Sequence, residues 1–221
     1  MNLEKTGNNK KRGLYAGRDI TDYNIAFEMG KPNKENCLYP DQIEEIAKNI
    51  LNKKTSFRYT DLCCGVGYAL RSLKKYLLGE GFFKGLFFQG VDIHTIDDNE
   101  IQKYLFDEDE DIPEDKYSFH FVHSNVEDFK YQEKQDLITC CNGLKDIENP
   151  LKLIRNSLNN LNIGGFFCIN ELNHIPNKKL LEYSLKYMED YTIYKGKTTV
   201  IFEKISDGNS EYILCSGDQK V

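Results

Sequence analysis

The sequence lacks long apolar runs and an excess of positive charge, and each absence argues against a class of protein. None of its 221 residues belongs to a run that approaches the roughly 20 apolar side chains of a membrane-spanning helix. The basic start, MNLEKTGNNKKRG, is not followed by an apolar segment, so no secretory signal is expected. The net charge is −6, whereas broad nucleic-acid binding needs a basic surface. A cytoplasmic protein is predicted that does not bind membranes and for which nucleic-acid binding is not expected.

The seven cysteines lack the C-x-x-C spacing that is typical of zinc sites. Without an export signal they are expected to be reduced thiols. Two adjacent pairs, Cys63–Cys64 and Cys140–Cys141, end predicted strands and should lie at the same edge of a sheet. Neighbours on a strand point to opposite faces, so each pair offers one thiol to a common centre. We therefore expect packing thiols and no metal, with a zinc or redox site as the alternative.

Helical and strand patterns alternate from residue 41 to residue 190. The firmest helix lies in YPDQIEEIAKNILNKK, where apolar residues recur at i, i+3, i+4, i+7 and i+8. A second helix is predicted after Asn149 as its cap, with Pro150 at the first helical position and Gly164 after its end. Buried strands are predicted between the helices. This order predicts an α/β fold with a parallel sheet and helices on both faces.

The first strand ends in TDLCCGVG, a stretch that outlines a ligand site. Gly65 and Gly67 allow a tight turn and the close approach of a ligand. Leu70 stands where a nicotinamide site would have its third glycine, which argues against an oxidoreductase. Asp61 would repel a pyrophosphate but suits an ammonium group. Asp92, at the end of the next strand, suits two ribose hydroxyls, or else caps a following helix. These features describe a ligand with an amino acid, a ribose and no phosphate.

The same landmarks, in this order, resemble the class I S-adenosylmethionine-dependent methyltransferases from about residue 41 to residue 175. The first family motif is acid-x-Gly-x-Gly-x-Gly, and here Cys63 replaces its first glycine. SNVEDF resembles the segment that brackets the adenine, with Asn125 where the family usually has aspartate. The stretch from QDLITCC to GGFFCINE resembles the fourth strand, a helix, an L-x-x-G-G turn and the fifth strand.

The resemblance implies a Rossmann-like fold with S-adenosyl-L-methionine as cofactor. Its sheet would be doubly wound, mostly parallel and seven-stranded, with an antiparallel C-terminal strand and helices on both faces. Residues 41–221 would form the cofactor-binding domain. Residues 1–40 would form an N-terminal arm or lid with Tyr15, Tyr23 and Phe27, or an amphipathic piece packed on the sheet. The implied cofactor-binding residues are Asp61, Cys63, Gly65, Gly67, Asp92, Ile93, Asn125, Val126, Cys140 and Cys141.

The expected function is in-line methyl transfer to a nitrogen or oxygen nucleophile of a small-molecule acceptor. Many small-molecule members have histidine after Leu144, where this chain has Lys145 and Asp146. Candidate bases are therefore Glu171, Lys145, Asp146 and Tyr23. Two alternatives stay open. One is methylation of protein or RNA, which only the lysine-rich start favours, and the other is a catalytically inactive protein that binds the cofactor.

Overall fold

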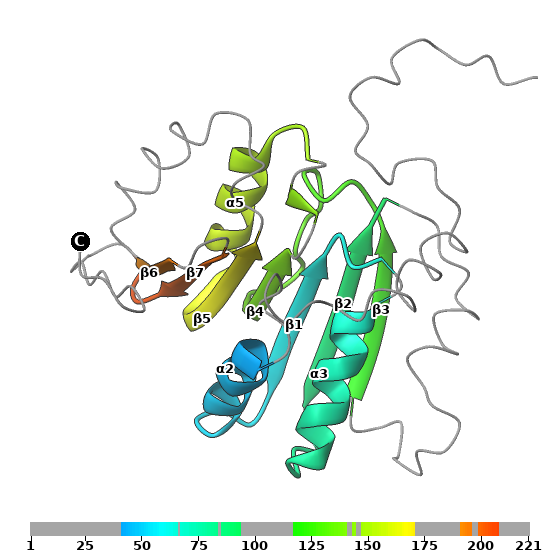
Figure 1. Ribbon diagram of the computed structural model, residues 1–221, viewed down its shortest axis with the longest axis vertical. Coiled ribbons are helices and arrows are strands. Elements are labelled where there is room, and N and C mark those ends of the chain that lie inside the picture. The colour runs from blue at the N-terminus through cyan, green and yellow to red at the C-terminus, as the bar shows by residue number, and fades with distance from the viewer. Residues whose placement is uncertain are drawn as a thin grey trace, which may run out of the picture.

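The computed structural model describes residues 41–65, 67–83, 85–93, 117–140, 143–144, 147–170, 191–195 and 199–207. These residues contain a seven-stranded sheet in the order β3-β2-β1-β4-β5-β7-β6 (Figure 1). The strands are β1 (Phe57–Leu62), β2 (Leu86–Asp92), β3 (Tyr117–His123), β4 (Gln135–Cys140), β5 (Leu161–Asn170), β6 (Tyr191–Lys195) and β7 (Thr199–Lys204). The helices are α2 (Asp41–Leu51), α3 (Tyr68–Gly79) and α5 (Pro150–Asn159).

The strand directions confirm the predicted α/β sheet, which is mostly parallel with an antiparallel C-terminal strand. Strands β3, β2, β1, β4 and β5 pair in parallel. The last strand, β7, runs antiparallel to both β5 and β6. Strand order reverses between β1 and β4, because the chain passes outward to β3 before it returns to β4. Ligands of such sheets bind where the order reverses, at the carboxyl ends of the strands.

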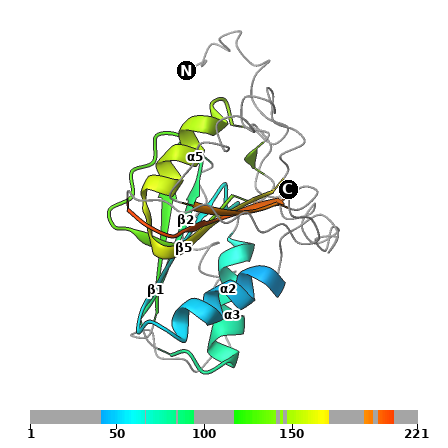
Figure 2. The ribbon, with the colours of Figure 1, turned by 90° about the vertical axis from the view of Figure 1, so that its left-hand side faces the viewer.

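The helices cover the sheet from two sides: α2 and α3 lie on one side and α5 on the other (Figure 2). The predicted amphipathic helix is confirmed in α2, whose buried residues Ile43, Ala47 and Ile50 pack with α3 and β1 in one hydrophobic cluster. A second cluster joins α5 to β4 and β5. Apolar residues on both faces therefore hold the central strands away from water.

The start of α5 agrees with the sequence prediction, but its end does not. The Asn149 side chain accepts a hydrogen bond from the backbone N–H of Lys152 at 3.1 Å, and Pro150 occupies the first helical position. The helix ends at Asn159, however, so Gly164 does not terminate it. Gly164 lies inside β5 with a φ of 74°. The reason is strand pairing: a register shift in the β4–β5 ladder is accommodated by residues 162–165.

Several predicted features lie outside the described residues. These are the N-terminal arm, two segments for which the sequence also predicts helices (DNEIQKYLF and residues 177–190 of NKKLLEYSLKYMEDY), and the acidic run at residues 107–111, which is predicted to be a loop. Within the described ranges, no helix has the length and apolar character needed to cross a membrane.

Candidate cofactor site

The turn from β1 to α3 has the backbone shape of a glycine turn, although it begins with cysteine. Cys63, Gly65 and Gly67 have φ values of 57°, 52° and 78°. In the part of the chain that the structure describes, Cys63 is the one non-glycine residue in the left-handed region. That conformation costs an L-residue about 1–2 kcal/mol, whereas glycine adopts it freely. Cys63 therefore adopts a backbone conformation that favours glycine, at the position where the family motif has one.

The thiols of the turn fit because glycines stand opposite them. A Cβ on Gly143 would lie 2.6 Å from Sγ of Cys63, and a Cβ on Gly90 would lie 2.8 Å from Sγ of Cys64. Both cysteines follow the end of β1 at Leu62, so the prediction that they end the strand itself is wrong by one to two residues. Without the constraint of extended backbone, each thiol points into space left by a glycine. This arrangement favours a packing role for both.

Burial affects the acidity of the Cys64 thiol and the placement of Cys140. Burial raises the pKa of Cys64, and the nearby charges of Asp61 and Asp92 raise it further, so this thiol stays neutral. The described residues include no cluster of three histidine, cysteine, aspartate or glutamate side chains that could hold a metal ion. Cys140 is buried at the end of β4, in the cluster shared with α5. Cys141 lies outside the described residues.

Two buried carboxylates flank the glycine turn. Asp61 on β1 is 4% exposed, and Asp92 at the end of β2 is 8% exposed. The carboxylate of Asp92 accepts a hydrogen bond from the backbone N–H of Gly65 at 2.8 Å, so it holds the turn in place. A carboxylate has lone pairs for about four hydrogen bonds, so this contact is compatible with binding of ribose hydroxyls as well.

Asp61 has a perturbed acidity. Burial raises its pKa to about 7, a hydrogen bond from the Thr139 hydroxyl lowers it, and the charge of Asp92 raises it. A buried carboxylate that is only partly ionised near neutral pH would gain from a cationic partner. The ammonium group of an amino acid is such a partner.

The residues after β2 and β3 line the same edge of the sheet. Ile93 exposes 59% of its surface directly beside the buried Asp92. Its carbonyl accepts a hydrogen bond from Nε2–H of His123 at 2.7 Å, and the Asp92 carbonyl accepts one from the Ser124 N–H at 2.9 Å. These bonds fix an exposed apolar side chain next to the carboxylate, as a surface for a flat ring would require.

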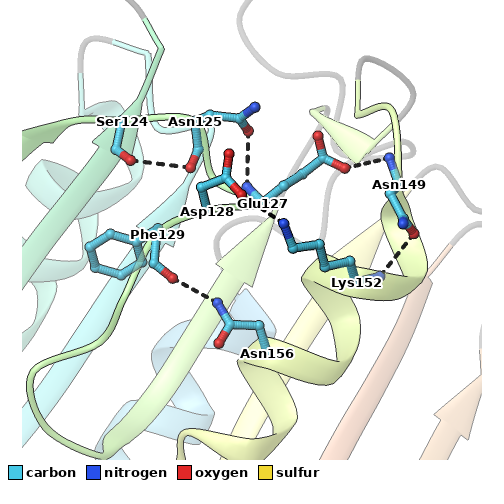
Figure 3. A network of polar contacts seen from close by, with 8 residues as sticks. All are labelled: Ser124, Asn125, Glu127, Asp128, Phe129, Asn149, Lys152 and Asn156. Carbon is cyan, nitrogen blue, oxygen red and sulfur yellow. Dashed lines mark hydrogen bonds and ion pairs between the residues drawn. The ribbon is translucent and has the colours of Figure 1, made fainter.

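The loop after β3 is fastened to the start of α5 by polar contacts (Figure 3). The Asn125 side-chain oxygen accepts from the backbone N–H of Glu127 at 3.0 Å. The Glu127 carboxylate accepts from the Asn149 N–H, and Asp128 pairs with Lys152 at 2.6 Å. Because its oxygen is engaged in this turn, Asn125 is held with its amide NH₂ as the group available to donate.

A polar cavity of about 490 Å³ lies between that loop and α5. Of the predicted site residues that the structure describes, only Asn125 lines this cavity, so the cavity is not the space around the two carboxylates. Its lining residues are Asn125, Glu127, Asp128, Glu148, Asn149 and Lys152.

The structure joins Gly65 to Asp92 by a hydrogen bond and brings Asp61 close enough to Asp92 for the charge of Asp92 to raise the Asp61 pKa. It places Val126, which is buried, in the cluster with Cys140. Sequence reasoning missed Thr139, which reaches Asp61 from the neighbouring strand, and Tyr59 behind it. A hydroxyl among the apolar residues of β4 was the only available signal. Seven predicted residues lie outside the described ranges: Tyr15, Tyr23, Phe27, Cys141, Lys145, Asp146 and Glu171.

The strand order, the glycine turn and the paired carboxylates define a class I, Rossmann-like S-adenosylmethionine-dependent methyltransferase. A family model described as a methyltransferase domain matches residues 33–194, and the chain belongs to this family. It is therefore an enzyme that transfers methyl groups, and S-adenosyl-L-methionine is the cofactor of this family. No curated protein matches the sequence.

Several solved structures share the fold. A putative S-adenosylmethionine-dependent methyltransferase from Methanococcus maripaludis is 16% identical with a TM-score of 0.55, covering 86% of this chain and 94% of its own. The plantazolicin methyltransferase BpumL, solved with a pentazolic desmethylPZN analogue and S-adenosylhomocysteine, is 15% identical with a TM-score of 0.55, covering 85% of this chain and 92% of its own. An rRNA methylase from Streptococcus thermophilus is 16% identical with a TM-score of 0.52, covering 74% and 95%. At these identities the likeness concerns the fold alone.

Proposed function

We propose that the enzyme transfers the methyl group of S-adenosylmethionine in line to a nitrogen or oxygen nucleophile of a small molecule. The observation that carries the proposal is the pair of buried carboxylates, Asp61 and Asp92, on either side of the Gly65 turn. A ligand with an ammonium group at one end and ribose hydroxyls in the middle satisfies both carboxylates. A pyrophosphate between them would be repelled.

Each part of the cofactor has a counterpart among the described residues. Asp61 receives the amino group of the methionine end. Asp92 receives the ribose hydroxyls while it holds Gly65 in place. The exposed side chain of Ile93 packs on the adenine, and Asn125 donates to an edge of the ring.

The positions that remain complete the pocket wall. Cys63 and Gly67 leave room for the methionine end, Val126 backs the adenine, and Cys140 and Cys141 border the methyl-transfer channel. When bound, the cofactor supplies an activated methyl group and leaves as a neutral thioether, so the protein mainly aligns the acceptor.

Residues outside the described ranges would complete catalysis. We propose residues 1–40 as a lid with Tyr15, Tyr23 and Phe27, which would exclude water from the acceptor, and residues 41–221 as the cofactor-binding domain. Glu171, Lys145, Asp146 or Tyr23 would take the proton where the acceptor has to lose one.

The net charge of −6 supports a small acceptor and a site that repels polyanions. The alternative is a protein or RNA acceptor. It is favoured only by the lysine-rich start KTGNNKKR, together with the fold shared with an rRNA methylase. Incubation of a cell extract with methyl-labelled cofactor separates these candidates. Label in the small-molecule fraction supports the proposal, label in RNA or protein contradicts it, and no label in any fraction supports an inactive cofactor-binding protein.

The first experiment is calorimetric titration with S-adenosylmethionine and S-adenosylhomocysteine. We expect the wild type and the control Glu45→Ala, which changes an exposed acid of α2, to bind alike. Asp92→Asn keeps the size of the side chain but loses its charge and one acceptor oxygen, so it should bind at least about tenfold more weakly. Asp92→Ala should lose binding. Equal affinity of wild type and Asp92→Asn would contradict the assigned site.

A further inference from the structure

Behind Asp61 lies a buried chain of hydroxyl groups that crosses from β1 to β4. Tyr59 and Asp61 are two residues apart on β1 and face the same side of the sheet. Thr139 is the register partner of Asp61 on β4 and donates its hydroxyl proton to the Asp61 carboxylate. The Tyr59 hydroxyl lies 2.9 Å from the Thr139 oxygen. Tyr59 and Thr139 are both fully buried.

The direction of these hydrogen bonds depends on the charge of Asp61. An ionised carboxylate only accepts, so Thr139 must donate to it. The Thr139 oxygen can then accept from the Tyr59 hydroxyl, so both hydroxyl groups have a hydrogen-bond partner. A protonated Asp61 can still accept from Thr139 through its carbonyl oxygen, but that hydrogen bond is no longer strengthened by the negative charge. The two hydroxyl groups therefore stabilise the ionised carboxylate of Asp61 in a buried position where water cannot solvate it.

We propose that Thr139 and Tyr59 are positioning residues that favour the ionised form of Asp61 and orient it for the amino end of the cofactor. This inference rests on the proposed role of Asp61 and deepens it. The two hydroxyls touch no reacting atom, and their effect passes through the carboxylate alone.

The surroundings of Asp61 both oppose and favour its ionisation. Burial is the largest influence that raises its pKa, and the Asp92 charge at the end of β2 raises it further, while the Thr139 hydrogen bond lowers it. The Cys64 thiol in the turn is a further ionisable group close to Asp61, and it is neutral because burial raises its pKa. Thr139 is thus the contact from a neighbouring strand that favours the charged form.

The test compares Thr139→Val, Thr139→Ser and Tyr59→Phe with the wild type in two measurements. The first is the titration of the Asp61 carboxyl in the cofactor-free protein, followed by infrared spectroscopy of aspartate-labelled protein with Asp61→Asn as the subtraction control. Thr139→Val should titrate at higher pH than the wild type, and Tyr59→Phe should move in the same direction by less. Thr139→Ser, which keeps the hydroxyl, should stay close to the wild type.

The second measurement is cofactor affinity from pH 5.5 to pH 8.5 by calorimetry. Below the Asp61 pKa, each unit by which a variant raises that pKa should weaken binding about tenfold. The variant and wild-type curves should converge at high pH, where Asp61 is ionised in every protein. A merely structural defect would instead weaken binding equally at every pH.

An unchanged carboxyl titration in both Thr139→Val and Tyr59→Phe would overturn the inference while wild-type binding stands. Tyr59→Phe removes a single oxygen, so it decides the matter even where Thr139→Val fails to fold. Failure of the proposed cofactor site would look different: the wild type would bind no cofactor at any pH, and that result would overturn the inference as well.

Discussion

At position 63 a cysteine holds the left-handed conformation that glycine adopts freely, and the space for its side chain comes from another residue. A Cβ on Gly143 would lie 2.6 Å from the Cys63 sulfur, a distance that real contacts do not show. Gly143 has no positive φ, so its backbone alone would accept alanine. The turn thus depends on this pair of residues: position 143 has to lack a side chain because the Cys63 side chain occupies that space.

This pairing predicts a specific double-mutant result. Gly143→Ala should lower the free energy of unfolding by about 1–3 kcal/mol, because its methyl group overlaps the Cys63 side chain. Cys63→Gly should be nearly neutral: relief of about 1–2 kcal/mol of backbone strain offsets the entropy of glycine and the lost packing. In the double variant, Cys63→Gly should restore at least about 1 kcal/mol to Gly143→Ala.

Urea unfolding of the four proteins measures this coupling. Cys63→Val serves as the contrasting control, since a β-branched residue at positive φ should destabilise the protein more than either single variant. Additive effects of Cys63→Gly and Gly143→Ala would contradict the contact.

At the scale of elements, Asp136 joins three strands at the edge of the sheet opposite the candidate site. It lies at the start of β4 and is 3% exposed. Its carboxylate accepts from the backbone N–H of Arg58 on β1 at 3.0 Å and from the Asn162 side chain on β5 at 2.8 Å, and it pairs with Lys54. One buried acid therefore satisfies donors from both neighbours of β4.

Asp136→Asn should destabilise the fold without changing the site. An amide offers one acceptor oxygen in place of two, so a buried donor loses its partner, at a cost of about 2–3 kcal/mol. Asp128→Asn is the matched control, because Asp128 and its partner Lys152 are both exposed, and it should cost less than about 1 kcal/mol. Chemical denaturation gives the two free energies and calorimetry the cofactor affinity. An equal cost for both variants would show that burial of Asp136 does not matter.

At the scale of the whole molecule, Asp61 makes folding depend on pH. Burial holds its pKa at about 7 in the folded protein, above the value of about 3.9 for an unfolded chain. Between these two values the folded state keeps a proton that the unfolded state has released. The stability from this group is therefore fully present below about pH 4 and is lost as the pH rises to about 7.

Asp61→Asn removes this dependence because an amide does not titrate. The free energy of unfolding of the wild type relative to Asp61→Asn should fall by about 1.4 kcal/mol for each pH unit between about 4 and 7, and then level off. At pH 8 the variant should be the more stable protein, although it should bind the cofactor poorly. Urea titrations from pH 4.5 to pH 8 test this, and parallel curves for the two proteins would contradict a raised pKa.

Local patterns in the sequence determined much of this protein. The stripe of Ile43, Ala47 and Ile50 defines an amphipathic helix because its period is that of the α-helix. Asn149 and Pro150 define the start of α5 through contacts a few residues away. The order of acid, glycine turn and second acid indicated the family and the cofactor, since each landmark is read from neighbours along the chain. These features need no knowledge of which strands are paired.

Only the tertiary structure decided which distant residues meet. Thr139 reaches Asp61 across 78 residues of sequence, and Gly143 faces Cys63, because β1 and β4 pair in one particular register. The same pairing of β4 with β5 ends α5 at Asn159 and draws Gly164 into a strand, against the local signal for a helix end. A hydrophobic period specifies which face of a strand is buried, but the partner strand and its register follow from packing of the whole sheet.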